Sequence, residues 1–91
     1  MTNEVGPVLE TGDLASAVIA AIRRTHREVR VEDHGAYQRV LVPSRCAVSR
    51  AAVERAFGKA VRFPGDLESI MPSFKGAFSV DENGARWGVA P

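Results

Sequence analysis

The sequence predicts an α+β domain, and three stretches of the chain carry this prediction. Residues 29–42 form two runs of β-forming residues around Gly35, which can supply the positive φ of a tight reversal. Residues 14–22 place their apolar side chains at helical spacing. Asn83 and Gly84 stand between two short alternating runs, which is a strong signal for a second hairpin. Hairpins and helices without repeated crossover units are typical of an α+β domain rather than of a parallel-sheet enzyme.

The first predicted strand covers residues 5–10, and the first helix follows it. Pro7 near the start of the strand indicates an edge strand, because proline donates no hydrogen bond to a neighbour. Thr11 or Asp13 is expected to cap the helix, which should end around residues 24–25. The helix has one apolar stripe that we expect to face the sheet, formed by Leu14, Ala17, Val18, Ala21 and Ile22.

Basic residues gather at the end of this helix, namely Arg23, Arg24, His26 and Arg27. Cations interact favourably with the negative end of a helix dipole, so a solvent-exposed helix end explains the cluster. A docking patch for an acidic partner surface is the alternative.

The central hairpin is the part of the chain on which the other segments are expected to pack. Val29 and Val31 alternate with Arg30 and Glu32, as in a strand with one buried face. The second strand of the hairpin is predicted over residues 37–42. A two-stranded ribbon alone is marginal in water, so flanking segments must cover its apolar face.

After a connection at residues 43–45, the stretch 46–48 is expected to re-enter the core. We interpret Cys46 as a buried small hydrophobe rather than a reactive thiol. Ser49 is a good N-cap for a second, shorter helix, and Gly58 stands where a left-handed C-terminal residue belongs. The apolar face of this helix is predicted at Ala52, Val53, Ala56 and Phe57.

The stretch 59–75 is predicted to be a long irregular connection, because two prolines and a glycine interrupt it. Such connections in small domains are often functional. Ile70, Met71 and Phe74 could fill the core or form an apolar contact site, and we expect at least two of them in the core.

A last hairpin is predicted with strands at residues 77–80 and 85–89. The predicted order is therefore strand, helix, strand, strand, helix, long loop, strand, strand, with two β-hairpins and two packed helices. We expect a compact single domain over residues 1–91, in which residues 1–4 form a short flexible N-terminus.

Composition excludes several classes of function. The 91 residues suffice for one core. The 12 Lys and Arg residues nearly balance the 11 Asp and Glu residues, so the net charge of +1 gives no basic field for nucleic acid. No apolar run approaches the roughly 20 residues that span a bilayer, and the first residues lack the pattern of a signal peptide. We therefore expect a cytoplasmic protein that binds neither nucleic acid nor membrane.

The chain offers little catalytic equipment. It has one cysteine and two histidines without the spacing of a metal site, and it lacks the GxSxG, GxGxxG and P-loop motifs. Glu32, Asp33, His34 and Tyr37 are the candidate acid–base residues. Neighbours on a strand point to opposite faces, so a solvent-exposed turn explains them better. We therefore expect a non-enzymatic, cofactor-free protein that binds another macromolecule.

Two other functions are open at this point. One is a small-molecule-binding α+β regulatory domain, which would show a well-formed internal pocket. The other is a sheet-based RNA binder, which would display stacking aromatic residues on neighbouring strands. The chain has 4 Phe, 1 Tyr and 1 Trp without a basic aromatic signature, which disfavours RNA binding.

Four stretches together resemble one known family, namely VGPVLETGDL, VEDHGAY, AFGKAVRF and SIMPSFKGAF. They stand in the same order and at similar separations in the small coupling or effector proteins of bacterial multicomponent monooxygenases. These regulatory components accompany methane, phenol, toluene, alkene and propane hydroxylases. The resemblance covers residues 5–89 and implies an α+β fold without a cofactor.

The resemblance implies that the chain docks on a separate diiron hydroxylase. Docking would couple oxygen activation and NADH use to hydroxylation or epoxidation of the substrate. The diiron centre would then belong to the hydroxylase, and an NADH-dependent reductase, with or without a ferredoxin, would supply the electrons. The free protein is expected to be a monomer.

The resemblance also implies partner contacts. The first candidates match the family loop that approaches the hydroxylase: Ile70, Met71, Pro72, Ser73, Phe74 and Lys75. Gly76 is expected to serve the geometry of the turn. A second group, for which a scaffold role is the alternative, comprises Glu32, Asp33 and Tyr37. Asn3 and Val5 match the N-terminal pattern, but the extension before them is short, so docking by a long tail is not expected.

Overall fold

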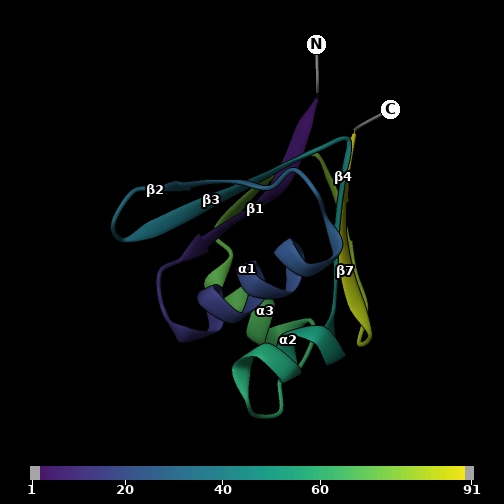
Figure 1. Cartoon of the computed structure of the whole chain (residues 1–91). Helices are drawn as coiled ribbons and strands as arrows, with labels where there is room; N and C mark the ends of the chain where they lie inside the picture. The colour runs from purple at the N-terminus through teal and green to yellow at the C-terminus, as the bar shows by residue number, and fades with distance from the viewer. Residues whose placement is uncertain (1–2, 90–91) are drawn as a thin grey trace.

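The computed structural model describes residues 3–89, which form seven strands and three helices in two antiparallel sheets (Figure 1). The elements are β1 (Glu4–Glu10), α1 (Asp13–Thr25), β2 (Arg30–Asp33), β3 (Tyr37–Pro43), β4 (Arg45–Ser49), α2 (Arg50–Phe57), α3 (Gly65–Ile70), β5 (Ser73–Lys75), β6 (Ala77–Val80) and β7 (Gly84–Gly88). One sheet has the order β2-β3-β1-β5 and the other the order β4-β7-β6. The helices lie in the angle between the two sheets (Figure 1). The predicted α+β class, both hairpins and the order of the predicted elements are confirmed.

The two sheets meet at a corner where the chain passes from one sheet to the other twice. Strand β3 continues into β4 through Ser44, which has φ 67°, and β5 continues into β6 through Gly76, which has φ 103°. A Cβ at Gly76 would lie 2.4 Å from the carbonyl oxygen of Gly88 and 2.8 Å from Cγ1 of Val5. Only glycine fits this position, because both the positive φ and the close approach exclude a side chain. The predicted turn role of Gly76 is confirmed.

The N-terminal strand β1 begins earlier than predicted and is a central strand of its sheet. Pairing begins at Glu4, and the Asn3 carbonyl accepts a hydrogen bond of 2.6 Å from the Ser44 N–H. Residues 3 and 4 are therefore ordered, whereas residues 1 and 2 of the predicted flexible stretch lie outside the described residues. The edge-strand prediction is wrong, because β1 pairs with β3 on one side and β5 on the other. Pro7 is tolerated because it falls in a gap of the β1–β3 ladder.

Helix α1 covers the inner face of the four-stranded sheet. The predicted side-chain cap is wrong: Gly12 is the N-cap without a side-chain hydrogen bond, and the Thr11 hydroxyl donates instead to the carbonyl oxygen of Gly35 at 2.6 Å. Asp13 stands in the first turn, where its charge complements the helix dipole. The predicted stripe is buried except for the half-buried Leu14, and Ala15 and Ile19 widen it.

Helix α2 begins and ends as predicted. The Ser49 hydroxyl accepts the N–H of Ala52 at 3.1 Å, and Gly58 has φ 83°. Its buried face is narrower than predicted. Val53 is fully buried, Ala52 and Phe57 are half-buried, and Ala56 is exposed, contrary to prediction.

The stretch predicted to be irregular contains a helix and a strand. Helix α3 follows Pro64, which occupies its N-cap, and the helix residue Leu67 is fully buried in the core. The proline that indicated a break is thus compatible with the start of a helix. Strand β5 then pairs with β1 through only three residues. Met71 is buried and Ile70 is half-buried, so the expectation of two core residues among three candidates is confirmed.

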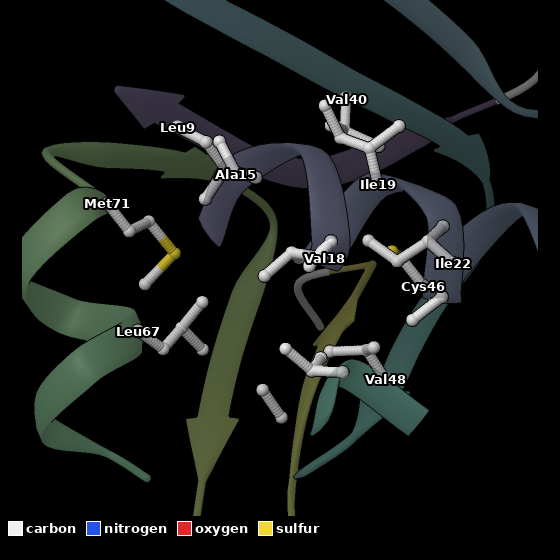
Figure 2. Close-up of a cluster of buried hydrophobic side chains, with 14 of the residues drawn as sticks. Leu9, Ala15, Val18, Ile19, Ile22, Val40, Cys46, Val48, Leu67 and Met71 are labelled. Atoms are coloured by element: carbon white, nitrogen blue, oxygen red, sulfur yellow. The ribbon is translucent and has the colours of Figure 1, made fainter. Parts of the chain in front are cut away.

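The core fills the angle between the sheets (Figure 2). Val18 and Ile22 of α1 point toward the strands of the second sheet, and Leu67 and Met71 close the core from the α3 side (Figure 2). Cys46 is buried as predicted, and burial raises the pKa of its thiol to about 12. A thiol with this pKa stays protonated at neutral pH and acts as a small apolar side chain.

Candidate functional site

Among residues 3–89, no helix covers one face of the four-stranded sheet, and we call this face the outer face (Figure 1). Strand register places alternate residues on it, because successive side chains point to opposite sides of a sheet. The opposite face carries Val5, Leu9 and Val40, which pack in the core. The outer face comprises Glu4, Val8, Glu10, Arg30, Glu32, Tyr37, Arg39, Leu41, Ser73 and Lys75.

The sheet brings two of the three predicted contact groups to this face. Glu32 of β2 pairs with Arg39, which lies in one row with Val8 and Ser73. Glu32 and Tyr37 of the hairpin group thus share one surface with Ser73 and Lys75 of the loop group, although about 40 residues separate them in sequence. Asp33 and Phe74 lie on the opposite side of the sheet. Since β2 and β5 are the two edges of a four-stranded sheet, they lie ~14 Å apart.

A charged network crosses the outer face. Arg30 donates to Glu4 at 2.6 Å, spanning β3, and it also pairs with Glu32. These hydrogen bonds to Arg30 lower the pKa of both carboxyl groups. Leu41 pairs with Arg30 across the two strands and is only 3% exposed, so this apolar side chain is covered although it lies on the same face as the charged network. Exposed ion pairs contribute little stability, so we assign this network to the shape and charge of the surface.

At one end of the outer face, Tyr37 stacks on His34. Their ring centroids are 4.8 Å apart, and Tyr37 is 39% exposed. Asp33 has a different role from its neighbours, because its Oδ1 accepts the Gly35 N–H at 2.9 Å and shapes the turn. The turn therefore presents an aromatic side chain, while Asp33 supports the scaffold.

The edge of the sheet at β5 presents the second aromatic feature. Phe74 is 44% exposed and its ring centroid lies 5.1 Å from that of Phe78. The ring centroid of Phe78 in turn lies 5.3 Å from that of Trp87, which is completely buried and whose Nε1 finds no hydrogen-bond partner within residues 3–89. This aromatic row links an exposed ring to the core of the second sheet. Phe74 projects at the edge from the side opposite the outer face, since it pairs with Pro7 of the inner face.

The remaining predicted contacts divide between surface and core. Pro72, Ser73 and Lys75 are exposed. Val5, at 2% exposure, and Met71, at 9%, are buried, so their side chains pack in the core of this chain and do not form part of its surface; their contact with a partner stays a prediction. Ile70 is half-buried against the core, and Asn3 is exposed beside β1.

Sequence reasoning missed the contributions of Arg30, Leu41 and Phe78. The alternation of side chains along each strand indicates which of these residues share a face. It does not indicate which strands pair, and only the pairing brings these residues beside the predicted contacts. Within residues 3–89, no group of three or more His, Cys, Asp and Glu side chains is arranged to hold a metal ion. In the same part of the chain, no helix is long and apolar enough to cross a membrane.

Comparisons with known proteins agree with the sequence resemblance. The model of the MmoB/DmpM family matches residues 3–88. The effector subunit of the alkene monooxygenase system of Xanthobacter autotrophicus (strain Py2) is 39% identical over 87 residues, covering 93% of this chain and 85% of that subunit.

A solved structure shows the same fold. A chain from the structure of a phenol hydroxylase–regulatory protein complex superposes with a TM-score of 0.79 at 14% identity, covering 93% of this chain and 95% of that one. The identity is too low for this likeness to extend beyond the fold. The family match over nearly the whole described chain, together with the alkene monooxygenase relative, shows that this chain belongs to the MmoB/DmpM family.

Proposed function

We propose that this chain is the effector component of a bacterial multicomponent monooxygenase, which docks on the hydroxylase and couples NADH use to substrate oxidation. The single observation that supports this most strongly is the 39% identity to an alkene monooxygenase effector subunit over 85% of that subunit's length. The proposed partner is a diiron hydroxylase, with electrons supplied by an NADH-dependent reductase and, in some systems, a ferredoxin. The effector itself acts without a cofactor, in the cytoplasm and as a monomer when free.

In physical terms, the effector acts by shifting a conformational equilibrium of the hydroxylase. A partner that binds one hydroxylase conformation more tightly stabilises it by the difference in binding free energy. A tenfold difference in affinity corresponds to about 1.4 kcal/mol, enough to change which conformation predominates when the two are close in energy. The reaction takes place in the hydroxylase. This chain changes the fraction of hydroxylase molecules whose active site is in the conformation that turns over productively.

The outer face and the adjoining β5 edge are the proposed docking surface. A sheet face is rigid, so little conformational entropy is lost when it docks. Phe74 offers an exposed ring at the β5 edge, projecting from the side opposite the outer face, which suits an apolar anchor for a partner that reaches around this edge. Tyr37 and the Arg30 network provide the polar surroundings that orient such a contact.

The proposal is tested by reconstituting the hydroxylase and electron-transfer proteins encoded beside this gene. Product formed per NADH consumed is measured while this protein is titrated in. We expect the yield to rise and to saturate at a fixed ratio of this protein to hydroxylase. Heat-denatured protein, added at the same concentrations, controls for non-specific protection.

An unchanged yield and rate across the titration, with folded protein and active hydroxylase, would contradict the proposal. A thermal-shift screen of the same preparation against metabolites then tests the small-molecule-binding alternative, since a ligand that binds the folded state raises Tm.

A further inference from the structure

The three-stranded sheet also has an outer face, and two arginines project from it. Strand register places Ala47 of β4 opposite Arg86 of β7, and Arg45 opposite Gly88. Residues two apart on a strand share a face, so the side chains of Arg45 and Arg86 lie on the same face. They are diagonal neighbours on the adjacent strands β4 and β7. Both side chains are exposed. The opposite face carries Cys46 and other core residues.

Arg45 and Arg86 line an open hollow of about 390 Å³ next to α1 and α2. The side chains around them are mainly small: Ala47, Ser49, Gly84 and Ala85. A second hollow, lined by Thr25, His26, Arg45 and Ala47, adjoins it toward the end of α1. The floor is therefore shallow, so the backbone of a docked segment can approach the sheet closely while its side chains reach the arginines.

The basic end of α1 is fixed beside this hollow by His26. Its Nε2 accepts the Ala47 N–H at 3.3 Å, and its Nδ1 lies 2.8 Å from the carbonyl oxygen of Ile22. The ring thus ties the end of the helix to the edge strand β4. Of the basic cluster noted in the sequence, His26 therefore lies beside Arg45 in the lining of the second hollow.

The charge of this region is locally unbalanced although the chain as a whole carries only +1. Within residues 3–89, the ion pairs that arginines form with carboxylates involve Arg30 and Arg50, and neither Arg45 nor Arg86 takes part in one. The one acid that lines the hollow is Asp81, whose Oδ1 accepts two backbone N–H groups of its own turn, at 2.8 Å and 3.0 Å. These bonds hold its carboxylate in the turn and lower its pKa, and the nearby charge of Arg86 lowers this pKa further, so Asp81 offsets part of the charge of Arg86 while Arg45 has no such neighbour in the lining.

We propose that this hollow binds an acidic segment of the partner protein, whose carboxylates accept hydrogen bonds from Arg45 and Arg86. Guanidinium groups pair with carboxylates through two parallel hydrogen bonds, and such charge-assisted bonds are stronger than neutral ones. The inference rests on the proposed function, under which the partner is the hydroxylase. The two outer faces adjoin at the corner formed by Ser44 and Gly76, so a partner that spans this corner would contact both.

The test compares two double variants in the coupling titration. Arg45→Gln/Arg86→Gln removes both charges of the hollow, and Arg55→Gln/Arg62→Gln removes the same charge from exposed arginines elsewhere. We expect the first to raise the half-saturating concentration about tenfold at low salt, with little difference from wild type at 0.5 M NaCl, because salt screens exposed charges. The control double variant should match wild type throughout, and both should keep the wild-type Tm.

Equal half-saturating concentrations for the two double variants would overturn the inference while leaving the proposed function standing, provided that the wild type raises the yield. If the wild type has no effect on yield, the proposed function itself fails. A heparin-affinity measurement distinguishes the occupant: loss of heparin binding by Arg45→Gln/Arg86→Gln, with unchanged response to the hydroxylase, would assign the hollow to a polyanion and overturn the inference.

Discussion

The Phe74→Ala variant separates a docking role from a folding role most clearly. Removal of a fully buried Phe destabilises a domain by about 3 to 5 kcal/mol. Phe74 is 44% exposed, so roughly half of this loss applies, and the free energy of unfolding should fall by about 2 kcal/mol, including the stacking on Phe78. In a domain of this size, that change lowers Tm by about 10 °C. The variant should therefore remain folded at the temperature of the assay.

Docking should suffer more than folding. We expect Phe74→Ala to raise the half-saturating concentration in the coupling titration at least tenfold, since an exposed ring at the edge of the docking surface acts as an anchor. Phe74→Tyr, which keeps the ring, should stay close to wild type. Phe63→Ala serves as the matched core control, because this Phe is 7% exposed and its loss should lower Tm further without a specific effect on docking.

Wild-type half-saturation by a folded Phe74→Ala protein, together with the lower Tm, would refute the reasoning. The ring would then serve the aromatic row that leads through Phe78 to Trp87 and would have no part in docking. Since Trp87 is the only tryptophan, its fluorescence reports on the row in each variant.

Four further predictions test the fold. Val18→Asp places an unpaired carboxylate in the core and should destabilise the domain by about 4 kcal/mol or more, seen as loss of the thermal transition. Gly76→Ala should lower the free energy of unfolding by about 2 to 4 kcal/mol, because its Cβ meets a carbonyl oxygen at positive φ; an unchanged Tm would disprove the corner geometry. Cys46 should react with iodoacetamide at pH 8 only after denaturation, and rapid labelling of the native protein would contradict its burial. The Val61 N–H donates to the Glu54 carboxylate and thereby lowers the pKa of Glu54 from its usual 4.5. The stabilisation from this hydrogen bond is complete above that pH and is lost as the pH falls through the lowered pKa of the folded state. The Glu54→Gln variant should therefore have a Tm that depends less on pH in this range.

Sequence patterns correctly predicted those helices and hairpins that are determined by residues close together in the chain. The alternation around Gly35, the helical spacing before Ile22 and the cap at Ser49 all reflect backbone geometry that a few neighbouring residues determine. Elements that depend on distant partners were missed. Strand β5 has three residues and exists because β1 pairs with it, and Pro7 is tolerated in a central strand because of a gap in the ladder with β3.

The same distinction applies to the candidate site. The predicted contact residues came from family resemblance, and local patterns could not distinguish Val5 and Met71, which face the core, from Ser73 and Lys75, which face outward. Face assignment requires strand register, which joins β2, β3, β1 and β5 into one sheet. Arg45 and Arg86, 41 positions apart in the numbering, are likewise neighbours only through the register of β4 with β7.

Amide hydrogen exchange of this protein, with and without its hydroxylase, tests the central claim most directly, because it reports both whether the two proteins bind and which surface is covered. The account predicts slower exchange at the edge strand β5 and at the turn between β2 and β3 in the complex, with α3 unchanged. Protection confined to α3, or no protection at hydroxylase concentrations that saturate the coupling titration, would contradict it.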